Sequence, residues 1–340
     1  MLSIESLRQE LASPRKIAII PHQKPDADAL GSSLALWGFF KNKGHQPVVV
    51  SPTDYPDFLC WMPGNSDVLV YSEQTKDTCA KAIIDAEMIF CLDFNDLKRC
   101  EPLDALVMAN TLAIKVLIDH HQDKKDFADF EYCRVTAAAT AELIYEFIGL
   151  LGNEADITSD IASCIYAGIM TDTGSFKYAA TTAAIHRTVA NLLEKGIDHV
   201  SIHRNIYDTS TLDRLKLKGF ALSERLKVIP ELKTAYFVLS KADLSKFHHQ
   251  TGDTEGLVNY GLSIKGIRLA VILKEDEGFV KISLRSVGNF SVNEMARTYF
   301  NGGGHINAAG GRLYNTSIQE AETAFLNTLK TYAPVLTSDQ

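Results

Sequence analysis

Short hydrophobic runs alternate with longer segments through the first half of the chain. The runs are KIAIIP, PVVV, DVLVY, EMIFCLD and KVLID, and the helix-like segment ADALGSSLALWGFFKNKG follows soon after the first of them. Nearly continuous hydrophobic runs of this length are typical of strands that are buried on both faces, and the segments between them have the length of helices. The pattern predicts an α/β domain built on a parallel sheet with helices on both sides.

The pattern changes towards the C-terminus. Residues 137–151 and 157–170 have hydrophobic residues at helical spacing, and residues 181–229 stay mostly helical but carry more charge. The runs TAYFVLS, IRLAVILKE and FVKISLRS then predict strands, followed by a helix, a glycine cluster and a closing helix. We therefore expect a smaller α+β domain over residues 228–340, joined by a helical linker over residues 206–227 to a first domain over residues 1–205.

Composition narrows the classes of function. The chain has 340 residues, of which 46% are hydrophobic and 22% are charged, as expected for two globular domains. A formal net charge of -8 argues against binding to long duplex nucleic acid, because that affinity depends on Lys and Arg at phosphates. The chain has no run of about 18 apolar residues, no signal peptide pattern and no CxxC pair among its six cysteines. We expect a cytoplasmic protein that does not bind membranes.

Ionisable side chains follow three of the predicted strands and one predicted helix. In chain order they are His22, Asp26, Asp28, Asp93, Asp119, His120, His121 and Asp172. Ligands of open α/β sheets bind at the carboxyl ends of the strands, so we expect these side chains to lie close together. Nitrogen and oxygen donors without sulfur suit manganese, and suit magnesium or zinc less well. The sequence therefore predicts a site for a divalent metal ion.

Several of these residues also have a purely structural interpretation. A single aspartate after a strand is most often a helix N-cap, which applies to Asp93 and Asp172 taken one at a time. The paired carboxylates Asp26 and Asp28 repel each other and are better explained by a cation between them. Asp119 has a different expected role, because a carboxylate beside a ligating imidazole commonly accepts a hydrogen bond from its second N–H group.

Five motifs, in order, carry a resemblance to a known family. HQKPDADALGS, the lone Asp93 after a strand, IDHHQ and GIMTDTGSF resemble the four motifs of the DHH phosphoesterase superfamily. GGGHINAAGG resembles the hallmark of the DHH-associated C-terminal domain. The layout is most similar to the compact oligoribonuclease and pAp phosphatase proteins of the NrnA type, and less similar to the larger RecJ exonucleases. The resemblance implies a parallel-sheet DHH domain and a smaller α+β domain across a cleft.

The resemblance also implies a pair of metal ions, usually Mn²⁺, with Mg²⁺ or other divalent ions as alternatives. The first ion would be held by His22, Asp26 and Asp93. The second would be held by a set that shares Asp93 with the first, namely Asp28, Asp93, His120 and Asp172. Two such ions can activate a shared hydroxide at neutral pH and neutralise phosphoryl oxygens. His121 would contact the scissile phosphate or the leaving oxygen, and its role as a general acid is a hypothesis.

The second domain is expected to recognise the substrate. Three glycines, Gly302, Gly303 and Gly304, let the backbone approach an anion and present N–H groups to it, although such a cluster can also be only a turn. Arg285 by itself could be an exposed strand residue in a surface ion pair. The resemblance implies that it binds a substrate phosphate, which suits its planar guanidinium. We expect Arg285 and His305 to hold the nonscissile phosphate or the terminal nucleotide.

The leading hypothesis is a metal-dependent phosphoesterase that releases mononucleotides from short single-stranded RNA and dephosphorylates 3′-phosphoadenosine 5′-phosphate (pAp). Alternatives are a phosphodiesterase for pApA or cyclic di-AMP, an enzyme like exopolyphosphatase or pyrophosphatase, and a nucleotide-binding protein without catalysis. A Rossmann-type dinucleotide binder is disfavoured, because KIAIIPHQKPDAD contains no GxGxxG. The sequence leaves monomer and homodimer open.

Overall fold

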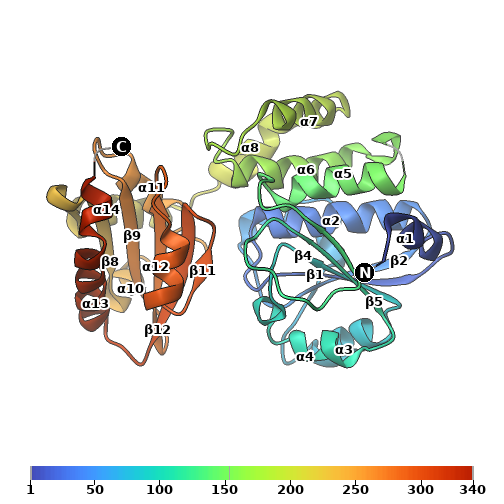
Figure 1. The fold of residues 1–340 in the computed structure, drawn as a ribbon, viewed down its shortest axis with the longest axis horizontal. Helices are drawn as coiled ribbons and strands as arrows, with labels where there is room; N and C mark the ends of the chain where they lie inside the picture. The colour runs from blue at the N-terminus through green and yellow to red at the C-terminus, as the bar shows by residue number, and fades with distance from the viewer. Residues whose placement is uncertain (1, 153, 339–340) are drawn as a thin grey trace. The chain divides into compact units, whose positions relative to one another are not determined.

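The computed structural model describes residues 2–152 and 154–338 (Figure 1). The chain divides into two compact units, Met1–Thr209 and Ser210–Gln340, and each is described by itself. The division falls within the segment 206–227 that we expected to be a helical linker. Residues 1 and 340, the outer limits of the two expected domains, lie outside the described residues.

Unit 1 is built on a six-stranded parallel sheet in the order β3-β2-β1-β4-β5-β6. Its strands are β1 (Lys16–Pro21), β2 (Gln46–Ser51), β3 (Leu69–Val70), β4 (Met88–Leu92), β5 (Ile114–Asp119) and β6 (Phe130–Cys133). Strand β4 is buried along its whole length and β1 along all but its first residue, as hydrophobic runs in a covered parallel sheet must be. Strand β6 was not predicted, because its sequence FEYC lacks a hydrophobic run and three of its four residues are only half-buried.

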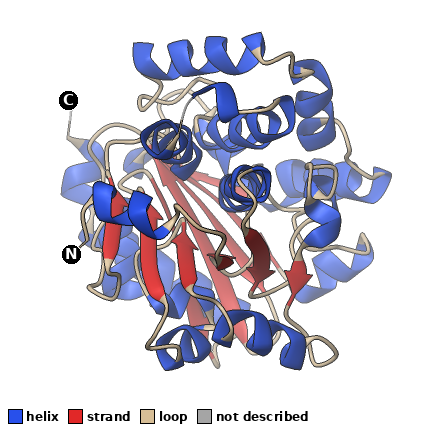
Figure 2. Cartoon of the chain, turned by 90° about the vertical axis from the view of Figure 1, so that its right-hand side faces the viewer, coloured by secondary structure: helices blue, strands red, loops and turns tan. Residues whose placement is uncertain are grey.

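Helices cover both faces of this sheet (Figures 1 and 2). They are α1 (Ile4–Glu10), α2 (Ala27–Asn42), α3 (Lys76–Ile84), α4 (Asp104–Ala109), α5 (Thr140–Leu151), α6 (Ser159–Asp172), α7 (Ala183–Glu194) and α8 (His199–Tyr207). Helices α2 and α5 pack on one face, with α6 packed on both of them, and α3 and α4 lie on the other face. The predicted α/β architecture of this unit is confirmed.

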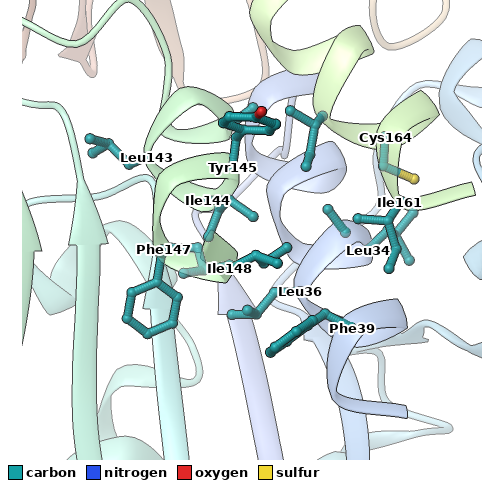
Figure 3. Packing of buried hydrophobic residues seen from close by; sticks show 14 of the residues in the cluster. Leu34, Leu36, Phe39, Leu143, Ile144, Tyr145, Phe147, Ile148, Ile161 and Cys164 are labelled. Atoms are coloured by element: carbon teal, nitrogen blue, oxygen red, sulfur yellow. The ribbon is translucent and has the colours of Figure 1, made fainter. Parts of the chain in front are cut away.

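Helices α2 and α6 approach each other unusually closely. A Cβ atom at Gly31 of α2 would lie 2.5 Å from the carbonyl oxygen of Cys164, and one at Gly168 of α6 would lie 2.8 Å from Oδ1 of Asp28. Side chains such as Leu34 and Ile161 interlock beside this contact (Figure 3). The two glycines therefore bring the C-terminal end of α6 against the first turn of α2.

Unit 2 contains a mixed sheet in the order β11-β12-β10-β9-β8-β7, in which only the β8–β9 pair is parallel within the described residues. The strands are β7 (Leu226–Ile229), β8 (Thr234–Leu239), β9 (Leu269–Glu275), β10 (Phe279–Ser286), β11 (Gly303–Gly304) and β12 (Ala308–Tyr314). The helices are α9 (Leu212–Phe220), α10 (Lys241–Lys246), α11 (Leu257–Leu262), α12 (Val292–Tyr299), α13 (Ile318–Thr331) and α14 (Ala333–Thr337). The predicted α+β architecture is confirmed.

The two faces of the unit 2 sheet have different hydrophobic cores. Side chains of α12 and α13 pack on one face, and those of α9, α10 and α11 pack on the other. Strand β12 was not predicted, because AAGGRLY reads as a continuation of the glycine-rich loop. It forms a strand because its small residues fit between neighbours: a Cβ atom at Gly311 would lie 2.3 Å from the carbonyl oxygen of Phe300. No helix in the described part of the chain is long and apolar enough to cross a membrane.

Candidate metal centre

The loop after β1 and the start of α2 supply the first donors. Asp26 is the N-cap of α2, and its Oδ1 accepts the N–H groups of Asp28 and Ala29, each at 3.0 Å. Its Oδ2 lies 3.9 Å from Nε2 of His22, whose Nδ1 is held by the carbonyl oxygen of Gln23 at 2.7 Å. Asp26 thus caps the helix with one oxygen and faces His22 with the other, so the cap and the ligand interpretations are compatible.

Asp28 is completely buried and joins α2 to α5. Its two oxygens accept the N–H groups of Thr140 at 2.6 Å and Ala141 at 2.8 Å, at the start of α5. The N-cap position of α5 is Ala139, which has no side-chain acceptor, so Asp28 serves as the cap from another helix. Because alanine cannot cap a helix, Ala139 is a feature of the sequence from which an acceptor elsewhere for the first N–H groups of α5 could have been inferred.

Asp93 lies at the centre of the cluster. It follows β4 with a left-handed backbone (φ 65°), a conformation uncommon for residues other than glycine and a frequent feature of functional sites. The residue is 2% exposed, and its Oδ1 accepts a hydrogen bond of 2.8 Å from Oγ1 of Thr140. Its two oxygens lie 3.4 Å from Nε2 of His22 and 3.5 Å from Nε2 of His120. Asp93 therefore stands between two imidazoles, supported by a threonine that sequence reasoning missed.

The two adjacent histidines after β5 have different neighbours. Nδ1 of His120 lies 3.2 Å from the carbonyl oxygen of Ala137, and its Nε2 lies 3.4 Å from Oδ2 of Asp172 at the end of α6. Nδ1 of His121 lies 2.7 Å from Oδ1 of Asp119. We expected Asp119 to orient a ligating imidazole, but the structure pairs it with His121. The reason is that side chains two residues apart in an extended segment lie on the same side.

These donors form sets that share one carboxylate. Three sets of residues have ligand atoms that lie within 4.8 Å of one another inside each set. The sets are His22, Asp26 and Asp93; Asp28, Asp93 and His120; and Asp93, Asp119 and His121. In the last set, His121 and Asp119 are already joined by their hydrogen bond. All three sets contain only nitrogen and oxygen donors, the inventory that suits hard or borderline divalent ions.

The electrostatics of the cluster also fit a cation. Burial raises the pKa of Asp28 to about 8, and the charge of Asp93 adds to this effect. Burial alone would raise the pKa of Asp93 as well, but its hydrogen bond with His22 and the nearby imidazole charges lower it below the ordinary value. Burial lowers the pKa of His22 and His120, yet the carboxylates outweigh it and raise both above 6.5. Without a cation the cluster holds protons that a divalent ion would displace.

The predicted substrate residues lie in unit 2. Arg285 of β10 is paired in register with Ala308 of β12, and the N–H group of His305 donates to the carbonyl oxygen of Ala308 at 2.7 Å. Arg285 and His305 therefore lie at the same end of β12.

The glycine cluster has a packing role that the sequence did not indicate. A Cβ atom at Gly302 would lie 1.9 Å from the carbonyl oxygen of Gly310, and Gly304 has φ 149°. The N–H group of Gly304 donates to Oδ1 of Asn293 at 2.9 Å, and that of Gly302 donates to the carbonyl oxygen of Ala296 at 3.2 Å. These two N–H groups are used inside unit 2, so the expectation that they bind an anion gains no support.

Comparison with known proteins assigns the chain to a family. The chain is 40% identical to a solved exopolyphosphatase-related protein from Bacteroides fragilis, over 98% of this chain and 97% of that one, with a TM-score of 0.92. Residues 16–169 match the DHH family, N-terminal domain, and residues 234–333 match the DHHA1 domain. The chain belongs to the DHH phosphoesterase family. The family predicted from the motifs is confirmed.

Curated DHH relatives carry a more specific name. The bifunctional oligoribonuclease and PAP phosphatase NrnA of Thermus thermophilus is 29% identical over 319 residues, which cover 92% of this chain and 89% of the relative. The protein of the same name from Bacillus subtilis is 26% identical over 310 residues, covering 91% of this chain and 92% of the relative. The likeness therefore extends over both units.

The matched DHH ranges contain nearly all of the predicted site. Five of the predicted metal ligands fall within residues 16–169, and Asp172 follows shortly after that range. Arg285, His305 and the glycine cluster fall within residues 234–333. The roles of these residues as metal ligands and substrate contacts stay predictions.

Proposed function

We propose that this DHH phosphoesterase degrades short oligoribonucleotides to mononucleotides and dephosphorylates pAp, using two divalent metal ions held in unit 1. The observation that carries the proposal is the pair of donor sets that share the buried Asp93. Support for the substrates comes from two relatives named oligoribonuclease and PAP phosphatase, which align with about nine-tenths of the chain.

The ligand assignment extends the donor sets by Asp172, whose Oδ2 lies 3.4 Å from Nε2 of His120. His22, Asp26 and Asp93 would hold one ion, and Asp28, Asp93, His120 and Asp172 would hold the other. When bound, such ions activate water at neutral pH and neutralise phosphoryl oxygens during in-line attack. We expect Mn²⁺, because borderline ions accept both imidazole and carboxylate ligands.

Hydrogen bonds from the chain orient these donors before any ion binds. Thr140 fixes one oxygen of Asp93, and the carbonyl oxygen of Ala137 lies within hydrogen-bond distance of Nδ1 of His120, leaving Nε2 towards the carboxylates. Asp119 holds Nδ1 of His121, which leaves Nε2 of that ring to exchange a proton with the leaving oxygen. His121 is the general acid of this proposal, and Asp119 is its positioning residue.

Substrate recognition is assigned to unit 2. Arg285 would bind a phosphate that is not cleaved, with His305 beside it at the same end of β12. Arg285→Ala should raise KM for RNA and pAp while leaving hydrolysis of a small chromogenic phosphodiester almost unchanged. Equal losses on both kinds of substrate would contradict this assignment.

The function is tested by comparing substrates side by side in Mn²⁺. Purified protein should hydrolyse pAp and RNA oligomers of mixed sequence at least as fast as the diadenylate pApA, and faster than cyclic di-AMP, polyphosphate or pyrophosphate. Asp93→Asn serves as the background control. Preference for cyclic di-AMP or pApA would replace the proposed substrate with the nearest alternative.

A second candidate is an activity like that of exopolyphosphatases. The observation that favours it is the solved relative of 40% identity, which is titled an exopolyphosphatase-related protein. Faster release of phosphate from polyphosphate than from pAp would support this candidate over the first.

We further expect the protein to act in the cytoplasm, where its free cysteines stay reduced, and to be a monomer or a homodimer.

A further inference from the structure

A row of three basic side chains crosses the unit 2 sheet. Lys281 of β10 is paired in register with Lys274 of β9 on one side and with Arg312 of β12 on the other. Residues directly opposite one another on neighbouring strands point to the same face, and like charges in such positions destabilise a sheet. The chain as a whole is acidic, with a formal net charge of -8, so its composition does not account for this row.

The row has little internal charge compensation. Nζ of Lys274 lies 3.5 Å from Oδ2 of Asp276. Within residues 2–152 and 154–338, neither Lys281 nor Arg312 forms an ion pair. Lys281 is solvent-exposed, yet neighbouring atoms desolvate its ammonium group and the charges of Lys274 and Arg312 repel it, which together lower its pKa below 10.5. The carboxylates of Glu255 and Asp276 act in the opposite direction without outweighing these effects. An anion bound to the row would relieve the repulsion.

Two aromatic rings continue the row on the same face. Phe279 and Tyr314 are paired in register, with ring centroids 6.0 Å apart, and the guanidinium of Arg312 lies 5.3 Å from the centroid of Phe279. Tyr314 is 55% exposed. Proteins bind single-stranded nucleic acids by combining cations for the backbone with aromatic rings on which bases stack. The surface offers both kinds of contact.

This surface is continuous with the predicted phosphate site. Lys281, Ser283 and Arg285 alternate along β10 and therefore share one face, and they lie opposite Arg312, Gly310 and Ala308 of β12. Four residues of strand separate Lys281 from Arg285, a distance of about 13 Å. Between the two cations, Ser283 of β10 and Gly310 of β12 are small, and α11 packs on this face against β8, β9 and β10, so an extended chain of phosphates would run on the β12 side of the face.

We propose that this surface, formed by Lys274, Lys281, Arg312, Phe279 and Tyr314, binds the further nucleotides of a single-stranded RNA whose end is held at Arg285. The inference rests on the proposed function, because it concerns the same RNA substrate. It adds a length preference to that function. RNA of about five nucleotides reaches the surface, whereas pAp is too short to reach it.

The test uses a charge-neutralising double variant, Lys281→Gln/Arg312→Gln. Its matched control is Lys81→Gln/Lys330→Gln, which removes two exposed positive charges, one on α3 of unit 1 and one on α13, which packs on the other face of the unit 2 sheet. Binding of a fluorescein-labelled RNA of about five nucleotides is measured by anisotropy in EDTA, where hydrolysis is blocked. The double variant should bind about tenfold more weakly, and the slope of log K against log salt should fall by about 1.4, since each lost contact contributes about 0.7 for a single strand. The control should bind as the unaltered protein does.

Variants of Tyr314 distinguish the contribution of base stacking to RNA binding from that of charge. Tyr314→Ala should weaken RNA binding by about fivefold or more, while Tyr314→Phe keeps the ring and should bind normally. In kinetic assays with Mn²⁺, the double variant should raise KM for the longer RNA and leave KM and kcat for pAp unchanged. Normal RNA binding by the double variant, or an equal loss on RNA and pAp, would overturn the inference.

The outcomes also separate this inference from the proposed function. If the unaltered protein binds the RNA through these residues but hydrolyses neither RNA nor pAp, the proposed function fails and the binding site stands. If it hydrolyses both and the double variant behaves like the control, the proposed function stands and the binding site fails.

Discussion

The candidate metal centre of unit 1 and the basic row of unit 2 are two concentrations of like charge, one buried and the other exposed. In unit 1, carboxylates such as Asp28 and Asp93 are buried and held by hydrogen bonds from Thr140 and Ala141. In unit 2, Lys281 and Arg312 are exposed and form no ion pair within the described residues. A small cation needs donors fixed in advance, whereas an extended flexible anion needs accessible charge.

The largest expected effect comes from removing the shared carboxylate. Asp93→Asn should lower kcat/KM by more than about 1,000-fold on every phosphoester substrate, because both metal ions lose a common ligand. Asp85→Asn removes an exposed carboxylate from unit 1 and should leave activity unchanged. Substantial turnover by Asp93→Asn would refute the two-ion centre, and RNA binding in EDTA should be nearly unaffected by it.

Variants of the two adjacent histidines distinguish metal binding from proton transfer within unit 1. His121→Ala should lower kcat by about 100-fold or more, as expected for loss of a general acid, with little change in metal affinity. His120→Ala should instead weaken Mn²⁺ binding by about 10–100-fold, measured by titration calorimetry. His248→Ala alters a largely exposed imidazole of unit 2 and provides the control. Identical behaviour of the first two variants would contradict their separate roles.

A smaller effect is expected from the threonine that supports Asp93. Thr140→Val keeps the shape of the side chain and the backbone N–H bond to Asp28, but removes the hydroxyl that donates to Asp93. Metal affinity should fall by about tenfold, within the range for residues that orient ligands. Thr140→Ser retains the hydroxyl and should restore most of the affinity. If valine and serine give the same result, Thr140 acts through packing alone.

The smallest effect concerns pH and the stability of the metal-free protein. In the folded protein the pKa of Asp28 is raised to about 8. The protonated carboxyl therefore contributes its full stabilisation of the folded state at low pH, and this contribution is lost as the pH rises through that value. The raised pKa values of His22 and His120 act in the same direction. Asp93 acts in the opposite sense, but only at acidic pH, because its pKa is lowered.

In EDTA, Tm should therefore decline between pH of about 4 and about 8, the interval between the ordinary and the raised pKa of Asp28. Saturating Mn²⁺ should flatten or reverse the decline, because the ion displaces those protons. A Tm that rises with pH in EDTA would contradict the electrostatics described for the metal centre.

The sequence predicted the strands that carry the metal centre because their hydrophobic runs are continuous, and polar residues such as Asp93 and His120 stand out at their ends. It did not identify Thr140, because a threonine at the start of a helix has no distinctive pattern. It did not indicate which of the two histidines Asp119 holds, since alternation along a strand decides that Asp119 meets His121. It missed β12, whose small residues form a strand through contacts with β10, β11 and α12.

Asp28 links the state of the metal centre to the backbone of α5. Its carboxylate accepts the N–H groups of Thr140 and Ala141, so any change in how that carboxylate is engaged alters the two bonds that close the first turn of the helix. Amide hydrogen exchange at these two positions should therefore respond when metal binds or is withdrawn. Exchange at the first turn of α5 would thus measure how much of the site is occupied by metal, without any substrate.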